Sequence, residues 1–190
     1  MKNMDISSID TAITKDNINN VIAKYKELLK DFPLTIHSSH ILELLQSLKR
    51  ENIGKGPYPN VSMFEAINRI MTDLVILCGV KELLDKGLEG IKFNTINVEY
   101  GHNNKQLHDI MAHENEITLH GEAFNVSRSL FQIKKRTSLN KLRKNIKGNT
   151  KLIIIFNKDA LNDSYLLKQK YDEYLLPVDI SMLFKEEQYD

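Results

Sequence analysis

Apolar residues recur at helical spacing near the start of the chain. The stripe that includes Val21 and Ile22 predicts a helix over residues 16–29. A second helix is expected to begin at Ser38 or Ser39, because either serine is a suitable N-cap. Together they predict an N-terminal helical hairpin. The spacing fits two uses of that hairpin equally, packing on the main domain or forming a dimer interface.

The longest periodic stretch covers residues 61–85. Ser62 followed by Glu65 matches a capping box, which predicts that the helix begins there. Apolar residues fall on most faces of this helix, so it is expected to be well buried. One polar strip remains along it, formed by Glu65, Asn68, Arg69 and Asp73.

The middle of the chain changes to patterns that favour strands. Strands are predicted over residues 92–100, 107–112 and 117–127, with a polar turn between the last two. A basic segment over residues 130–146 has an apolar helical stripe. Residues 151–156 are almost wholly apolar, which is typical of a strand buried on both faces.

The C-terminal part predicts two further elements. Residues 159–171 fit a helix, and residues 174–183 fit an edge strand, because Pro177 would interrupt a central strand. Before these two, the order is a helical pair, then helix, three strands, helix and strand. This order predicts a mixed α/β domain whose first three strands form an antiparallel meander.

The segment from Gly54 to Asn60, GKGPYPN, is the clearest loop in the chain. One interpretation makes it the boundary between an N-terminal helical subdomain, residues 1–55, and a main α/β core, residues 56–190. The other makes it an ordinary connection within one domain. The length of 190 residues suits one domain with a small appendage.

Composition narrows the classes of protein. The chain is 42% apolar and 27% charged, which supports a packed core and argues against disorder. The only cysteine, Cys78, lies in an apolar run and is interpreted as a core residue. With no disulfide possible within the chain, no apolar leader at its start and no apolar run long enough for a bilayer, we expect a cytoplasmic protein without a membrane segment.

Charge is unevenly distributed. Seven basic and no acidic residues lie between Lys134 and Lys147. Because the whole chain carries 26 basic and 25 acidic residues, removing those seven leaves the rest with a net charge of −6. This asymmetry predicts a local surface that binds anions.

Two acidic residues lie on the two predicted strands that the polar turn connects. Asp109 begins one predicted strand and Glu122 lies on the next, where alternation places it on one face with His120, Phe124 and Val126. A hairpin would bring the two carboxylates side by side. Carboxylate oxygens suit Mg²⁺, and Mg²⁺ next to lysines suits phosphodiester hydrolysis. The chain has no P-loop, GxGxxG or GxSxG motif.

With Asp109 in HDIMA and Glu122 in GEAFNV, the chain resembles the restriction-endonuclease-like PD-(D/E)XK nuclease superfamily between Asn60 and Phe156. The resemblance implies an α/β core of helix, three-strand meander, helix and strand. It also implies a magnesium-dependent endonuclease, with Mn²⁺ as a substitute ion, that hydrolyses DNA in the manner of a type II restriction enzyme. A homodimer that cuts both strands is a further expectation from the family.

The chain departs from the family pattern at two positions. His108 replaces the proline before the aspartate, and Phe124 stands where the motif has its lysine. The lysine migrates within this superfamily, so Lys134 and Lys135 become the candidates for it. Glu65 matches a glutamate that members use on the first core helix, as a third metal ligand. The structural alternative for Glu65 is its capping box, and for Asp109 a turn cap.

The basic helix is expected to contact phosphates along a nucleic-acid backbone, DNA or RNA. Its candidate contacts are Lys134, Lys135, Arg136, Lys141, Arg143 and Lys144. A zinc site is a weaker hypothesis for the histidines of this region, because no HExxH or cysteine-based spacing accompanies them. These histidines are His102, His108, His113 and His120.

Three functions therefore fit the sequence. The first is a Mg²⁺-dependent endodeoxyribonuclease that uses Asp109, Glu122, Glu65 and a lysine. The second is a catalytically inactive nucleic-acid-binding module of the same fold, with Phe124 marking the lost lysine. The third is an α/β protein whose basic helix binds an acidic partner protein.

Overall fold

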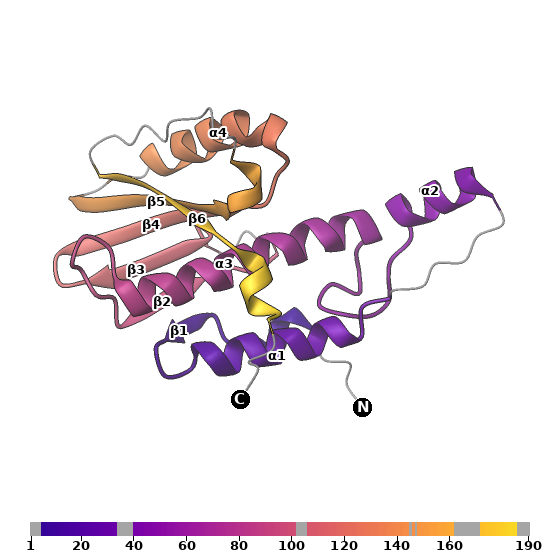
Figure 1. The fold of residues 1–190 in the computed structure, drawn as a ribbon, viewed down its shortest axis with the longest axis horizontal. Helices are drawn as coiled ribbons and strands as arrows, with labels where there is room; N and C mark the ends of the chain where they lie inside the picture. Colours follow the sequence, from indigo (N-terminus) through magenta and orange to yellow (C-terminus); the bar gives the residue numbers. More distant parts are fainter. Residues whose placement is uncertain are drawn as a thin grey trace.

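A computed structural model describes residues 5–33, 40–101, 106–144, 146, 148–161 and 172–185. A six-stranded mixed sheet runs through it in the order β1-β2-β3-β4-β5-β6. Helix α3 lies along one face of the sheet and α4 lies on the other (Figure 1). The strands are β1 (Ala12–Thr14), β2 (Thr95–Val98), β3 (Ile110–Glu114), β4 (Ile117–Phe124), β5 (Asn149–Asn157) and β6 (Glu173–Val178). The α-helices are α1 (Ile18–Lys30), α2 (Ile41–Arg50), α3 (Met63–Lys86) and α4 (Phe131–Arg143).

The predicted meander is confirmed. Strands β2, β3 and β4 pair antiparallel, and the turn between β3 and β4 has Asn115 at a positive φ of 55°. Strand β5 then pairs parallel to β4, with α4 as the connection, and β6 pairs parallel to β5. Strand β6 forms one edge of the sheet and contains Pro177, as the sequence predicted.

Helix α3 is buried along most of its length because apolar residues cover most of its surface. Ser62 caps it by accepting a hydrogen bond from the Glu65 backbone N–H. Gly79 brings the helix close to the sheet, since a Cβ there would lie 2.5 Å from atoms of Ile155. The main core lies between this helix and the sheet.

A second, smaller core lies between α4 and the other sheet face. Its centre is aromatic: the rings of Phe131 and Phe156 are 4.8 Å apart, and Phe124 lies 6.0 Å from both. Leu142 completes the buried side of α4. The predicted face of β4 is therefore confirmed, because Phe124 and Val126 pack on the α4 side.

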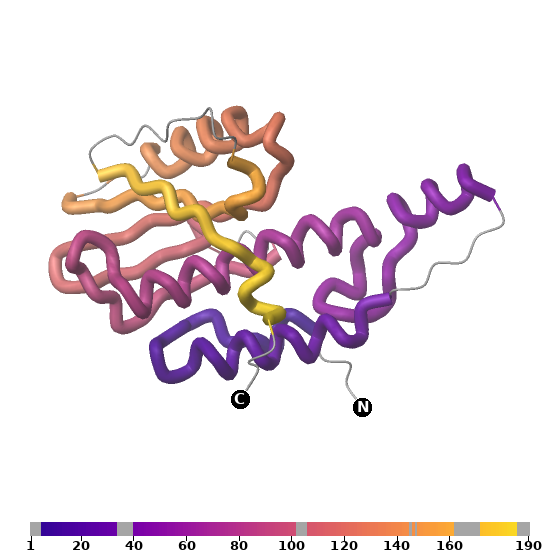
Figure 2. The backbone as a smooth tube through the Cα atoms, viewed as in Figure 1, coloured from indigo at the N-terminus to yellow at the C-terminus, as the bar shows by residue number. Residues whose placement is uncertain are grey.

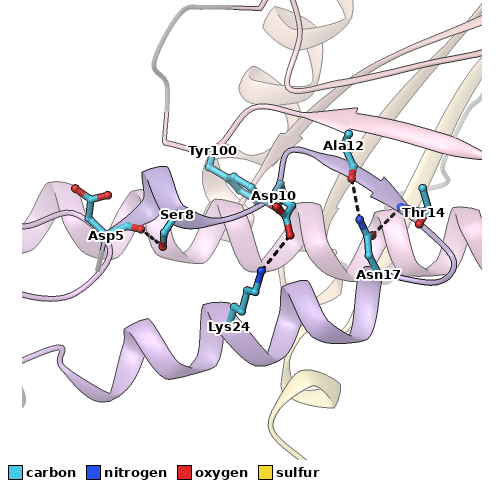
Figure 3. Close-up of polar contacts among 8 residues, drawn as sticks. All are labelled: Asp5, Ser8, Asp10, Ala12, Thr14, Asn17, Lys24 and Tyr100. Carbon is cyan, nitrogen blue, oxygen red and sulfur yellow. Dashed lines mark hydrogen bonds and ion pairs between the residues drawn. The ribbon is translucent and has the colours of Figure 1, made fainter. Parts of the chain in front are cut away.

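The N-terminal segment adds a strand that the sequence did not reveal. Strand β1 pairs with β2 at the sheet edge opposite β6. The Asn17 side chain closes the turn after β1 by accepting from the Thr14 N–H and donating to the Ala12 carbonyl, and Lys24 pairs with Asp10 (Figure 3). With three residues, β1 is too short for its alternation to be visible.

The two N-terminal helices pack separately. Helix α1 buries one face, including Tyr25, in the main core, whereas α2 contacts the N-terminal part of α3 and has no buried residue. Helix α2 projects away from α1 (Figure 1), so the expected hairpin of two paired helices is not formed. The helix start expected at Ser38 or Ser39 lies outside the described residues.

The C-terminal part of the chain crosses α3 and descends toward α1 (Figure 2). There, the Lys26 ammonium lies 5.8 Å from the centre of the Phe184 ring. A short 3₁₀ helix at Lys158–Ala160 begins where the sequence predicted a helix over 159–171, and residues 162–171 lie outside the described part. Among the described helices, none has the length and apolar character needed to cross a bilayer.

Candidate active site

The two predicted carboxylates meet across the meander. Asp109 directly precedes β3, and the pairing of Ile110 with Gly121 places it beside Glu122 on β4. Both side chains line one cavity of about 160 Å³, so the expected juxtaposition is present. The cavity is lined by Glu99, Gln106, Asp109, Glu122, Lys134, Thr137, Ser138 and Lys141.

Glu122 is only 6% exposed, and its carboxylate contacts two side chains, Lys141 and His108. The Lys141 ammonium lies 2.8 Å from its Oε1 and 2.9 Å from its Oε2. The Nδ1 atom of His108 lies 3.0 Å from Oε1. A buried carboxylate is costly without such partners, so these contacts account for a charge inside the fold.

His108 is buried beside its neighbour His120, with ring centres 4.7 Å apart. The contact with Glu122 assigns the His108 Nδ1 proton as the donor. Its Nε2 atom and the Nδ1 atom of His120 are buried and find no hydrogen-bond partner among the described residues. Burial, followed by the nearby His108, lowers the pKa of His120. The His120 ring, packed on His108, is therefore uncharged at neutral pH.

Asp109 is positioned by the backbone of the next strand. Its Oδ2 accepts a hydrogen bond of 2.9 Å from the Ala123 N–H. Glu99, directly after β2, donates its backbone N–H to the Asp109 carbonyl and also lines the cavity. The Glu99 carboxylate accepts from the Gln106 N–H at 2.8 Å. Glu99 is a third acidic residue at this cavity, and the imperfect alternation over 92–100 gave no signal for it.

Hard oxygen ligands for a divalent cation are therefore supplied by Asp109 and Glu122. Within the described residues, no group of three or more Asp, Glu, His or Cys side chains is already arranged as a metal site. Mg²⁺ generally binds through one or two carboxylates and keeps several waters. For the zinc hypothesis, His113 contacts Thr118, and His102 lies outside the described residues.

One face of α4 points its polar side chains at the cavity. Lys134, Thr137, Ser138 and Lys141 follow the i, i+3, i+4, i+7 spacing of a single helical face. Lys141, expected only to contact phosphate, is the lysine that binds Glu122. Helical spacing counted from Lys134 could have identified it. Lys135 does not share this face; its ammonium lies 5.8 Å from the centre of the Phe131 ring.

The other candidate phosphate contacts of α4 differ in their surroundings. Arg136 and Lys144 are exposed. Arg143 forms an ion pair of 2.6 Å with Glu173 at the start of β6, which commits its guanidinium to the fold. The exposed basic surface is therefore smaller than the sequence suggested.

Glu65 lies at a different cavity from Asp109 and Glu122. It pairs with Arg69 one turn further along α3 and lines a cavity of about 340 Å³. Lys134 lines both cavities, so they adjoin at this residue. Glu65 is thus near the carboxylate pair without sharing its cavity, contrary to the expectation of a common metal site.

Asp73 leaves the polar strip that the sequence assigned to it, and Thr72 takes its place. Asp73 is fully buried and accepts hydrogen bonds from the hydroxyls of Tyr25 and Tyr58 and from the Gly101 N–H. Burial is the main reason that the pKa of Asp73 rises to about 7. This carboxyl connects α3 to α1 and to the loops that contain Tyr58 and Gly101, so it has a structural role.

Gly121 and Cys78 have structural roles as well. Gly121 faces away from Glu122, and a Cβ there would lie 2.8 Å from Ile153 and 3.0 Å from Ile110. It therefore makes room for core side chains rather than for a ligand. The partly buried Cys78 packs against the main core, and burial raises the pKa of its thiol to about 12, which makes it a poor nucleophile.

Comparison with known proteins adds no relative: no family model, curated protein or solved structure matches this chain.

Proposed function

We propose that the chain is a magnesium-dependent endonuclease that hydrolyses DNA phosphodiester bonds, in the manner of a small type II restriction enzyme. The observation that carries this proposal is the shared cavity of Asp109, Glu122 and Lys141 near the C-terminal end of the central strand β4. Two carboxylates and a lysine ammonium are the groups that a hydrolytic phosphodiesterase needs in one place.

Asp109 and Glu122 would hold the metal, which supplies charge neutralisation and a more acidic bound water. Both are already held by the protein, Asp109 by the Ala123 N–H and Glu122 by His108 and Lys141. These contacts fix the carboxylates before any ligand arrives, so little ordering remains to be done on binding. Glu99 supports the loop before Asp109 rather than acting on the phosphate.

Lys141 is the best candidate for the displaced lysine of the motif. Its side chain is 49% exposed although its ammonium bonds the buried Glu122, so it reaches from solvent into the cavity. There it would stabilise negative charge on the phosphate. Lys134 lines the same cavity and is the second candidate, whereas Lys135 lies by the Phe131 ring and does not line this cavity. Phe124 is accounted for by its place in the aromatic core.

DNA would lie over the exposed part of α4, where Arg136 and Lys144 are free of the ion pair that holds Arg143. A homodimer remains our proposal for cutting both strands. Helix α2 offers exposed Ile41, Leu42 and Leu45 for contact between copies.

The test is hydrolysis of supercoiled and linear duplex DNA with Mg²⁺ or Mn²⁺. Wild-type protein should produce nicked and cut products that Glu122→Gln does not. Lys135→Met is a matched control on the same helix and should cut like the wild type. Equal cleavage by wild type and Glu122→Gln would remove Glu122 from the mechanism.

A second candidate is an inactive nucleic-acid-binding module of the same fold. The observation that favours it is that Lys141 and His108 already satisfy both oxygens of Glu122. Binding without nicking over a range of sequences and both metals, unchanged in Asp109→Ala, would select this candidate.

A further inference from the structure

We infer that the 340 Å³ cavity beside the candidate active site is a subsite for one nucleotide of the bound strand, the one next to the scissile phosphate. This inference rests on the proposed nuclease function and adds to it a place where bases are distinguished. The cavity is lined by Glu65, Asn68, Arg69, Thr72, Ala123, Phe124, Asn125, Val126 and Lys134.

Position in the fold is the first argument. The cavity lies where β4 ends, between the N-terminal half of α3 and the start of α4. Strands β4 and β5 are parallel, and ligands of open α/β sheets bind beyond the carboxyl ends of such strands. The carboxylate pair lies at the same end of these strands, because Glu122 is near the C-terminal end of β4.

Continuity with the carboxylate cavity is the second argument. Lys134 lines both spaces, so a strand whose phosphate lies near Lys141 would bring the neighbouring nucleotide to Lys134. The lysine can contact the phosphate between the two nucleotides. A volume of about 340 Å³ falls within the range of small-molecule sites and accommodates one nucleotide.

The chemistry of the lining is the third argument. Asn68 and Asn125 contribute amide groups, which both donate and accept and therefore match the edges of bases. The Asn125 Oδ1 atom is buried and has no hydrogen-bond partner among the described residues. Such an unsatisfied acceptor carries a cost that a ligand donor, such as the exocyclic amino group of adenine or cytosine, would relieve after a small rotation of the amide.

Arg69 is arranged as a fixed wall of this subsite. Its guanidinium bonds Glu65 and lies 5.4 Å from the centre of the Tyr58 ring, so its position is set before a ligand binds. The carboxylate of Glu65 partly neutralises it, which favours recognition of a base edge over capture of a second phosphate. Glu65 thereby has a role here instead of at the metal.

The experiment is a titration of ¹⁵N-labelled full chain, in EDTA to prevent cleavage, with the 5′-phosphorylated deoxydinucleotides of A, C, G and T. The side-chain amide signals of Asn68 and Asn125 should shift, and the A or C dinucleotides should bind more tightly than that of T. Asn68→Ala should weaken binding at least threefold. Asn140→Ala, an exposed asparagine on α4, is the matched control and should bind like the wild type.

Two outcomes would overturn the subsite. One is the absence of shifts at Asn68 and Asn125 at millimolar dinucleotide, and the other is equal binding by Asn68→Ala and Asn140→Ala. Cleavage is measured separately on duplex DNA. Dinucleotide binding at these amides without any cleavage by the wild type would refute the nuclease proposal and keep the subsite. Cleavage without the shifts would refute the subsite alone.

Discussion

The Lys141 ammonium lies 2.8 Å from the nearest carboxylate oxygen of Glu122, although one residue is on α4 and the other on the central strand β4. Lys141 reaches Glu122 from solvent, whereas Glu122 is buried. The pair therefore joins the basic helix to the acidic strand at the cavity that also contains Asp109. Helix α4 thus packs on the second core and also supplies the lysine of the proposed active site.

Removing the ammonium of Lys141 should affect both stability and activity. Lys141→Met leaves Glu122 with His108 as its remaining side-chain partner, so the free energy of unfolding at neutral pH should fall by about 1–3 kcal/mol. Loss of charge stabilisation at the phosphate should lower the cleavage rate by roughly 10²–10³-fold. Chemical denaturation and single-turnover cleavage measure the two effects. Lys135→Met, which leaves the cavity intact, should change neither; a similar loss in both variants would contradict this role.

His108 should act by positioning Glu122. His108→Phe keeps a buried ring but removes the Nδ1 hydrogen bond to Oε1. Because groups behind a metal ligand tune its affinity, the Mg²⁺ concentration for half-maximal cleavage should rise by about 10–100-fold. At saturating Mg²⁺ the rate should recover most of its wild-type value. Titration of cleavage against Mg²⁺ tests this, and an unchanged midpoint with a lower maximal rate would argue against a positioning role.

Asp73 should make folding stability depend on pH. Burial raises the pKa of Asp73 to about 7 in the folded protein, above the value of about 3.9 expected when unfolded. The folded state therefore binds the proton more tightly, and stability is lost as pH rises from about 4 through 7. For this group the slope approaches about 1.4 kcal/mol per pH unit. Urea denaturation across this pH range should show that the free energy of unfolding falls less for Asp73→Asn than for the wild type. The same pH dependence in both proteins would contradict a raised pKa of Asp73.

The exposed cations of α4 should determine the salt dependence of DNA binding. Each phosphate neutralised contributes a slope of about −0.9 to the plot of log affinity against log salt. Arg136→Ala or Lys144→Ala should each make that slope shallower by about that amount. Arg143→Ala should leave the slope unchanged and reduce stability, because Arg143 bonds Glu173. Fluorescence anisotropy at several salt concentrations measures the slopes, and a slope that only Arg143→Ala alters would reverse this assignment.

The periodicity of the sequence predicted most of the fold. The meander, the burial of most of β5 and the edge position of β6 followed from local patterns, since each strand's alternation or apolar run reflects its burial. Strand β1 did not, because three residues carry too little pattern. The separation of α1 from α2 depends on tertiary packing on α3, which helical spacing does not encode.

The candidate site was predicted in part for similar reasons. The β3–β4 hairpin brings Asp109 and Glu122 together, as expected from their positions on two adjacent predicted strands. Lys141 was assigned as a phosphate contact because it belongs to the basic segment. Helical spacing places it on one face with Lys134, but its pairing with Glu122 on β4 depends on tertiary packing. Glu65 was assigned to the metal by family resemblance, whereas its contact with Arg69 and its separate cavity depend on the position of the start of α3.

The most direct measurement of the central claim is calorimetric titration of Mn²⁺ into the wild type, Asp109→Asn, Glu122→Gln and the control Glu114→Gln, whose carboxylate contacts Asn94 outside the cavity. If Asp109 and Glu122 together hold the ion, the wild type and Glu114→Gln should bind Mn²⁺. Asp109→Asn and Glu122→Gln should each lose at least tenfold in Mn²⁺ affinity. Equal Mn²⁺ affinity in all four proteins, or no binding by the wild type, would contradict the metal-dependent account.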